Sequence, residues 1–181
     1  MINIKKAAIC AVLFMLIFNI AGCSAKSIIV SGNSMVPTIE NGDKLILSEL
    51  VGNLKHNDIA VIDIEIPANE IINDKNMIIV TRIIGLPGDE IDIDFENGLI
   101  IRNNSFLLHE IIDGGLYEDG HRINAPTNNS YDMDDGIFTV PENKLFVLGD
   151  NRNSSFLDSR SDLVGFVDID NVIGIIQLQE E

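Results

Sequence analysis

Short apolar runs separated by turn-forming residues characterise the chain beyond residue 26. None of these runs keeps a 3.6-residue apolar repeat over three turns, and isoleucine and valine are frequent in them, which favours β-strands. Strands at this spacing predict a mainly β architecture of antiparallel sheets, barrel-like or sandwich-like. The expected strands lie in nine runs: KSIIVSG, DKLILSELV, DIAVIDIEI, MIIVTRIIG, DEIDIDF, GLIIRN, GIFTVP, KLFVLGD and VIGIIQLQ.

The run EIDIDFENGLIIRNNSFLLHE alternates apolar and polar residues, as the half-buried strands of an antiparallel sheet do. Asn97-Gly98 within it predicts a hairpin turn. Residues 113–135 are instead rich in Gly, Asn and Asp, which predicts a surface loop or a polar insertion. We find no repeat and no second domain, so residues 24–181 are expected to form one β-rich domain.

The first 23 residues, MINIKKAAICAVLFMLIFNIAGC, predict a membrane anchor or a targeting signal. Lys5 and Lys6 precede the apolar run Ala7–Phe18, which predicts a cytoplasmic N-terminus and an exported domain. As a membrane-spanning helix, Ala7–Cys23 has 17 residues, the lower limit for crossing the hydrocarbon core. As a signal peptide, the 12-residue run Ala7–Phe18 has the length of an h-region.

The ending IAGC also resembles a bacterial lipobox, in which Cys23 would be lipidated and become the first residue of the mature chain. With either anchor, we expect the domain to lie on the outer face of a bacterial cell membrane. The second cysteine, Cys10, lies in the same apolar segment, so the domain has no disulfide and no cysteine metal site.

The charge of the chain excludes one class of partner. The 181 residues carry a net charge of −16, and all 28 acidic residues follow Cys23, against ten of the twelve basic ones. The part beyond Cys23 therefore carries −18. Nucleic-acid-binding proteins need basic patches, so an acidic surface of this kind argues against that function.

Ser34, in the stretch SGNSMVPTIENGD, is a candidate nucleophile. A serine hydroxyl attacks efficiently only when a positioned base activates it. This stretch, together with TRIIGLPGDEI and VLGDNRNSSFLDSR, resembles the type I signal peptidases, which are membrane-bound serine endopeptidases with a Ser/Lys dyad. The resemblance covers residues 28–175, in the same order and with matching flanks. It implies the signal peptidase I fold, Ser34 as the nucleophile, and no cofactor.

At the position of the lysine base, the chain has Thr81, whose hydroxyl cannot serve as a general base at neutral pH. Lys75 lies six residues earlier, about 20 Å away along one strand, too far to replace it. Lysines elsewhere could approach only through the tertiary fold: Lys44, Lys55 and Lys144. His109 and His121 have a suitable intrinsic pKa, but neither occupies the lysine position, and we expect both to be solvated surface residues.

Other matched residues are expected to support the site. The resemblance implies that the Ser34 N–H stabilises the oxyanion and that Gly32 stands where some relatives carry a serine. The segment GDNRNSSFLDSR is one residue longer than is usual for the family, so either Ser155 or Phe156 fills the position of the serine that orients the lysine. We expect a structural set of ion pairs and hydrogen bonds here, with no metal ligands because the cluster lacks His and Cys. The supporting residues are Arg82, Asp150, Arg152, Asp158, Ser159 and Arg160.

Two functions are consistent with these residues. The first is a signal peptidase I-type serine endopeptidase that removes signal peptides from exported precursors. The second is a catalytically inactive relative that keeps the peptide groove and acts as a binding or assembly factor for secreted or pilin-like proteins. Self-cleaving repressor domains share the Ser/Lys chemistry, but the N-terminal apolar segment and the absence of a DNA-binding region argue against them.

Overall fold

The computed structural model describes residues 26–48, 52–66, 76–128, 133, 136–153 and 157–178. Within these ranges the chain is built from β-strands and one short 3-10 helix, η2 (Ile169–Asn171). No helix in the described ranges is long and apolar enough to cross a membrane. The anchor interpretation of residues 1–23, including Cys23, falls outside the described residues.

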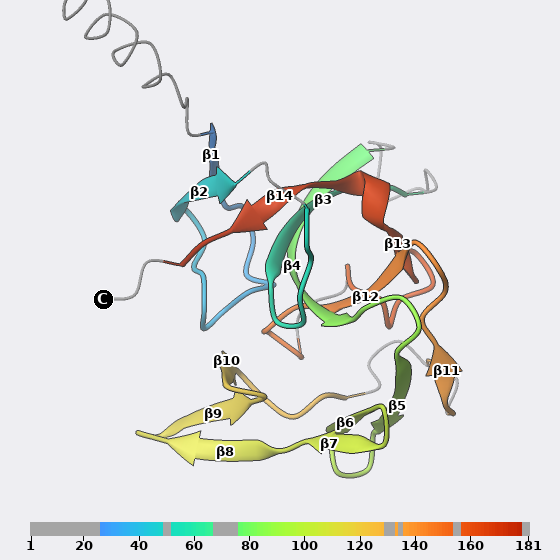
Figure 1. Ribbon diagram of the computed structural model, residues 1–181. Coiled ribbons are helices and arrows are strands. Elements are labelled where there is room, and N and C mark those ends of the chain that lie inside the picture. Colours follow the sequence, from blue (N-terminus) through green and yellow to red (C-terminus); the bar gives the residue numbers. More distant parts are fainter. Residues whose placement is uncertain are drawn as a thin grey trace, which may run out of the picture.

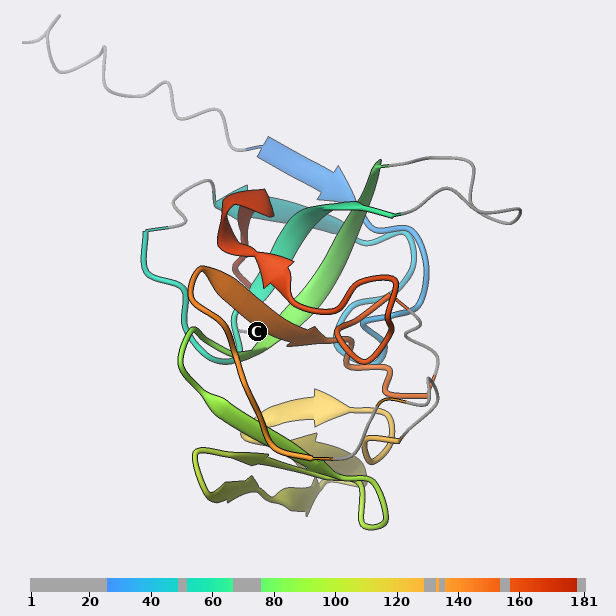
Figure 2. The same cartoon turned by 90° about the vertical axis from the view of Figure 1, so that its right-hand side faces the viewer.

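A seven-stranded sheet forms the larger part of the domain, and its neighbouring pairs are antiparallel (Figures 1 and 2). Its spatial order is β1 (Lys26–Ile29), β2 (Lys44–Ser48), β14 (Val172–Ile176), β3 (Ile59–Glu65), β4 (Asn76–Gly85), β12 (Lys144–Leu148) and β13 (Val167–Asp168). The longest pairing joins β3 to β4, from Ile59 opposite Arg82 to Glu65 opposite Asn76.

Two smaller antiparallel sheets lie together on one side of the large sheet, as both views show (Figures 1 and 2). One has the order β11 (Phe138–Thr139), β5 (Glu90–Asp94), β6 (Leu99–Arg102) and β7 (Ser105–Leu107). The other has the order β10 (His121–Ile123), β9 (Gly115–Glu118) and β8 (His109–Ile112). The mainly β, antiparallel fold expected from the sequence is therefore confirmed, and each of the nine apolar runs contains a strand.

The polar stretch 113–135 differs from the expectation of a surface loop. Strands β9 and β10 lie in its first part, and Glu118, Ile123 and Thr127 are at most 2% exposed. The surface-loop interpretation is wrong for these residues. A polar strand can be buried here because its carboxylate finds a guanidinium partner, Arg152, in the neighbouring loop.

The β5–β6 hairpin forms where Asn97-Gly98 predicts it, but its loop is longer than two residues. Asp94 pairs with Leu99, so the four residues 95–98 make the turn. Gly98 has a φ of +71°, and its N–H donates to the Asp94 carbonyl at 2.7 Å. A side chain at this position would lie within 2.4 Å of Pro126, so only glycine fits.

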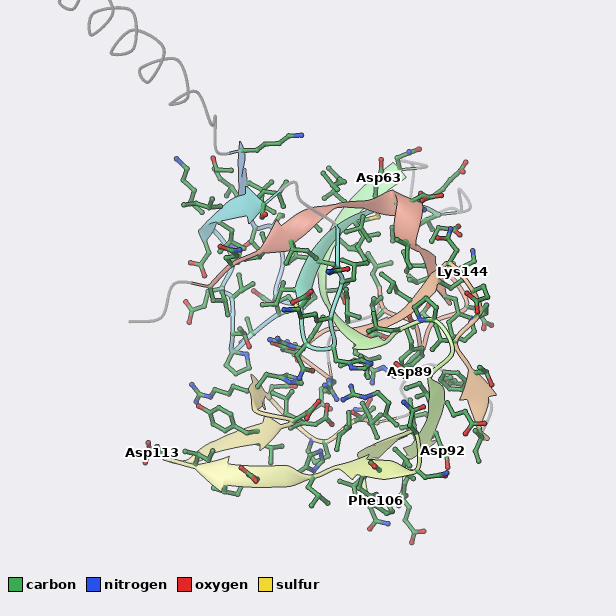
Figure 3. All side chains as sticks on the ribbon, viewed as in Figure 1. Asp63, Asp89, Asp92, Phe106, Asp113 and Lys144 are labelled. Carbon is green, nitrogen blue, oxygen red and sulfur yellow. The ribbon has the colours of Figure 1, made fainter. Side chains whose placement is uncertain are left out.

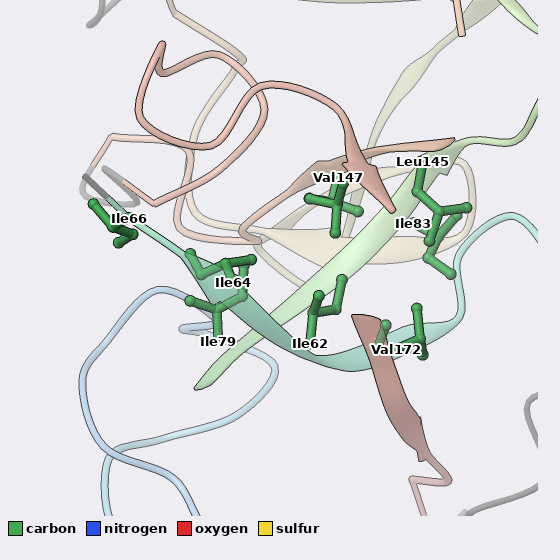
Figure 4. Packing of buried hydrophobic residues seen from close by; sticks show 10 residues of the cluster. Ile62, Ile64, Ile66, Ile79, Ile83, Leu145, Val147 and Val172 are labelled. Carbon is green, nitrogen blue, oxygen red and sulfur yellow. The ribbon is translucent and has the colours of Figure 1, made fainter. Parts of the chain in front are cut away.

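The core between β3, β4 and β12 is formed almost entirely by branched aliphatic side chains (Figure 4). Ile62, Ile83 and Val147 are fully buried in it. Alternation along β3 and β4 places these side chains on one face of the sheet, because successive strand residues point to opposite faces. A second cluster, with Phe138, Phe146 and Phe166 in contact, joins the large sheet to β5 and β6.

Ile62→Ala tests the central role of this core. Ile62 has no exposed surface, and removing a buried isoleucine side chain typically costs about 2–5 kcal/mol. We expect a loss of that size in urea unfolding followed by circular dichroism. Ile46→Ala is the matched control, because Ile46 is 52% exposed and should cost less than about 0.5 kcal/mol. Equal losses in both variants would contradict the assigned core.

Candidate functional site: the Ser34 groove and its supporting loops

Ser34 lies in the turn that follows β1, and two buried side chains come after it in this turn. Met35 and Ile39 are each 1% exposed, and the Ile39 N–H donates to the Met35 carbonyl at 3.0 Å. Before the turn, Gly32 has a φ of +103°, and its N–H donates to Oδ1 of Asn41 at 2.9 Å. The apolar anchors after Ser34 and the Gly32 turn before it fix the position of the serine.

A groove of about 520 Å³ runs beside Ser34. One wall is the segment Ile28–Ser34, and the other is the segment Met77–Val80 of β4, with Leu157 also contributing. Most of the lining side chains are apolar. The candidate nucleophile therefore lies at the edge of an apolar groove that is formed by two stretches of extended chain.

Both walls of the groove have an unpaired strand edge. β1 is the last strand of the seven-stranded sheet, and among the described strands it pairs only with β2. β4 pairs along its length with β3, but β12 covers only Arg82–Gly85 on its other side. The first part of β4 thus leaves backbone N–H and C=O groups without ladder partners among the described strands, and an extended peptide can pair with such groups.

Thr81 follows the groove-lining Val80 on β4 and lies opposite Ala60 on β3. It is 1% exposed, and its hydroxyl oxygen has no hydrogen-bond partner among the described residues. Ile79 and Ile83, on the same face of β4, belong to the apolar core. This buried, apolar setting would lower the pKa of a lysine, as a neutral amine base requires, but a threonine supplies no amine.

No lysine in the described ranges is buried. Lys44 and Lys55, two of the candidate substitute bases, are exposed, and the third, Lys144, pairs with Asp168 at 2.7 Å. Lys75 falls outside the described residues. A neutral amine base needs a buried, apolar setting, and none of the described candidates has such surroundings.

His121 is buried rather than solvated, so the expectation of a surface histidine is wrong for this residue. It is 8% exposed, and neither ring nitrogen has a hydrogen-bond partner among the described residues. Burial, together with the nearby Arg82 and Arg152 charges, lowers the pKa of His121 to about 4 despite the Asp150 and Glu118 carboxylates. Because Arg82 and Thr81 are neighbours on β4 and point to opposite faces, this cluster lies on the side away from Thr81.

The other two histidines, unlike His121, each have a carboxylate within hydrogen-bond distance. His109 lies 3.4 Å from Glu118 through its Nε2 atom, and its side chain is 16% exposed. His56, which the sequence did not single out, lies 2.7 Å from Asp89. Neither histidine lines the groove.

Arg82 and Asp150 form a buried, two-pronged ion pair. Nε of Arg82 donates to Oδ1 of Asp150 at 2.7 Å, and Nη2 donates to Oδ2 at 2.5 Å. The Thr38 hydroxyl also donates to Oδ2 of Asp150, at 2.5 Å. The carboxylate thereby connects β4, the loop after β12 and the turn that carries Ser34, and every charge in this cluster has a partner.

Asn151 clamps the backbone of the Ser34 turn. Its N–H donates to the Ser34 carbonyl, and its side-chain amide donates to the Asn33 carbonyl, both at 2.9 Å. Asn124, at the end of β10, in turn donates to Oδ1 of Asn151 at 2.8 Å. The Ser34 N–H itself donates to no acceptor among the described residues.

The expected set of supporting charges divides into three separate pairs. Asp158 and Arg160 pair with each other at 2.8 Å. Asp150 pairs with Arg82, whereas Arg152 pairs with Glu118 at 2.6 Å. Ser159 supports β12 because its Oγ accepts the Val147 N–H at 2.8 Å, and Ser155 falls outside the described residues.

Sequence reasoning missed three residues that hold this site together. Asn151 lies within the matched GDNR segment, and its place beside Asp150 was the one signal that could have revealed it. Glu118 and Asn124 lie in the polar stretch where we expected a loop, and nothing local distinguishes them from surface residues. Their partners, Arg152 and Asn151, come from a segment about 30 residues further along the chain.

Comparison with known proteins supports the motif analysis. The family model described as "Signal peptidase, peptidase S26" matches residues 1–179. Signal peptidase I P of Bacillus subtilis subsp. natto is 33% identical over 153 residues, which cover 83% of this chain and 74% of that protein. Signal peptidase I of Bacillus caldolyticus is 35% identical over 161 residues, which cover 83% of this chain and 76% of that protein.

A solved structure of a signal peptidase I from Enterococcus faecalis can be superposed on part of this chain. The match covers 69% of this chain and 97% of that chain, with 25% sequence identity and a TM-score of 0.44. The family model and the curated relatives establish the class of the protein. The chain belongs to the signal peptidase family S26, whose members are serine endopeptidases that process signal peptides.

The buried His121 should make folding stability depend on pH. The unfolded chain protonates this histidine below its ordinary pKa of 6.5, whereas the folded chain does so only near pH 4. The contribution of His121 to the free energy of unfolding should therefore be highest above pH 6.5. It should fall as the pH is lowered from 6.5 to about 4, by at most about 1.4 kcal/mol per pH unit. Urea unfolding at a series of pH values measures this slope.

His121→Leu should flatten the slope between pH 6.5 and 4, because the titrating group is gone and no unpaired ring nitrogen remains buried. The variant should still lose stability below pH 4.5. The reason is Glu118, which still titrates below pH 4.5. Burial favours the protonated form of this carboxyl group, but the Arg152 charge outweighs burial and lowers the pKa of Glu118 to about 2. An unchanged slope above pH 4.5 in His121→Leu would contradict the assignment.

Proposed function

We propose that this chain binds signal-peptide-bearing precursors in the Ser34 groove and hydrolyses them very slowly or not at all. The observation that carries the proposal is Thr81, a buried residue beside the groove with an unpartnered hydroxyl at the position where the family places its base. The groove and its supporting loops are intact, while the group that would activate Ser34 is missing.

Binding needs no base. An extended precursor segment can add to the open edges of β1 and of the first part of β4, using main-chain hydrogen bonds, while apolar side chains of the groove contact alternate residues of the peptide. The Ser34 N–H can donate to a peptide carbonyl that reaches the end of the groove. These contacts depend on backbone groups and apolar surface, which the Thr81 substitution leaves in place.

Hydrolysis does need a base. A neutral serine hydroxyl attacks a peptide carbonyl poorly, and loss of a general base typically costs about 10²–10⁴ in rate. The loss can approach the whole covalent contribution, because the members of a catalytic unit act together. The described lysines and histidines supply no replacement in the groove.

A signal peptidase I-type endopeptidase that uses another base is the alternative function. Ser34 and its unengaged N–H favour it, because they form half of the catalytic arrangement that the family uses. The partners would be exported precursors in both cases. A binding or assembly factor could also present pilin-like subunits to a second enzyme.

Thr81→Lys distinguishes between these functions. The lysine would enter a buried, apolar position next to the groove, where its pKa would fall, and we expect cleavage of a signal-peptide substrate to rise above the wild-type level. Full-length protein in detergent, a fluorogenic peptide that spans a signal-peptide cleavage region, and anisotropy of the uncleaved peptide give both rate and affinity. The wild type should bind without measurable turnover.

Three controls accompany this measurement. Thr81→Met has similar length but no amine and should remain inactive, and Ser34→Ala combined with Thr81→Lys should remove the gained activity. Ser34→Ala alone should leave peptide binding within about twofold of wild type, since main-chain contacts dominate it. If wild type cleaves rapidly and Ser34→Ala abolishes cleavage, an unidentified base exists and the binding-protein proposal is wrong.

We further propose that residues 1–23 tether the domain to the outer face of the membrane, on the basis of the sequence IAGC at the end of a short apolar run. Metabolic labelling with a fatty acid should mark the wild type, and Cys23→Ala should abolish the label. The matched control is Cys10→Ala, which should keep it. An unlabelled wild type that retains its first 22 residues, as shown by intact mass, would mean that the segment is an uncleaved helix.

A further inference from the structure

The segment Ser105–Ile112 forms an open edge of the two smaller sheets. It contains β7 and β8, which are separated only by Leu108. β7 is the last strand of its sheet beside β6, and β8 is the last strand of its sheet beside β9. Along this segment one side of the backbone therefore has no ladder partner among the described strands.

The open edge is unusually apolar for a solvated strand. Phe106, Leu108 and Ile111 are 55%, 64% and 73% exposed, and Ile112 is 45% exposed. Figure 3 shows Phe106 projecting away from the body of the molecule. Proteins usually protect such edges with lysine, proline or a covering segment, but the sequence SFLLHEII contains neither residue. An exposed apolar edge of this kind marks an interaction surface.

A recess beside Phe106 gives this edge a specific shape. Its volume is about 240 Å³, and its lining includes Ile101, Phe106, Ile137 and Asp92. Asp92 pairs with Ile101, and Ile101 pairs with Phe106, so these three side chains lie in one row across β5, β6 and β7. A strand added next to β7 would extend this row and place an apolar side chain beside Phe106.

Carboxylates surround the edge. Glu90 and Asp92 line the Phe106 recess, Glu110 lies in β8, and Asp113 lies in the turn that follows it, at the far end of the edge in Figure 3. None of the four forms an ion pair among the described residues. The whole chain carries −16. A second copy would bring like charges together, and anionic lipid headgroups would be repelled.

We propose that the edge Ser105–Ile112 binds an extended segment of a partner protein that carries both apolar and basic residues, and that this segment adds as a β-strand. Main-chain pairing would satisfy the open edge, apolar side chains would cover Phe106 and Leu108, and lysine or arginine would pair with the flanking carboxylates. The surface shares no residue with the Ser34 groove, so this site goes beyond precursor binding.

The test uses the full-length protein in detergent and a short fluorescent peptide of alternating valine and lysine. We expect saturable binding that weakens with salt. Two matched peptides separate the contribution of charge from that of main-chain pairing. A peptide of alternating valine and glutamate has the opposite charge and should not bind. A valine–lysine peptide with a methylated backbone cannot form the ladder of hydrogen bonds and should bind at least about tenfold more weakly. Equal binding of all three peptides would overturn the proposal.

Variants locate the site. Leu108→Lys and Ile111→Lys, separately and together, should weaken binding of the valine–lysine peptide by about tenfold or more. Each substitution removes an apolar contact and adds a positive charge that repels the lysines of the peptide. Ile46→Lys is the control, because Ile46 is a similarly exposed isoleucine on β2 and should leave binding unchanged. A photoreactive version of the peptide should cross-link to residues 105–112. Cross-links in Ile28–Ser34 would assign the peptide to the groove and reject the edge site.

Two further outcomes would contradict the chosen partner. Sedimentation of the wild type as a dimer that Leu108→Lys dissociates would make a second copy the occupant. Binding to vesicles of neutral phosphatidylcholine that Leu108→Lys and Ile111→Lys abolish would make a lipid surface the occupant. We expect neither, since the acidic rim favours a basic protein segment over both.

Discussion

The ion pair between Arg82 and Asp150 is the interaction on which the site depends. It is almost fully buried, so each charge is costly to bury without the other. Through Asp150 it also orients the loop in which the next residue, Asn151, holds the Ser34 turn. A buried ion pair adds little net stability, but its fixed two-pronged geometry specifies how three distant segments meet.

This arrangement explains how the groove keeps its shape with a threonine at position 81. The position of Ser34 is set by Met35, Ile39 and Asn151, and none of these contacts involves Thr81. Thr81 in turn is buried on the face of β4 that carries the core residues Ile79 and Ile83. The contacts that position Ser34 beside the groove are therefore separate from the side chain of residue 81.

Local pattern predicted the strands well because each of the nine runs is a short stretch of β-branched residues bounded by turn residues. The family motif around Ser34 was equally readable from the sequence, and the roles of Ser34 and Thr81 stay predictions. The strands in 113–135 were missed because their burial depends on the Glu118–Arg152 pair, which joins segments far apart in sequence. His121 was misjudged for the same reason, since polar neighbours in sequence say nothing about what covers a side chain in the fold.

The buried Thr81 has a consequence for the history of the protein. Some threonine codons differ from a lysine codon by a single base, so the family's usual residue is one mutational step away. A change of that codon would place a lysine beside a groove, a buried ion pair and an Asn151 clamp that are already present. Residue 81 is thus a position at which one base change would exchange a buried hydroxyl for an amine within an otherwise unchanged architecture.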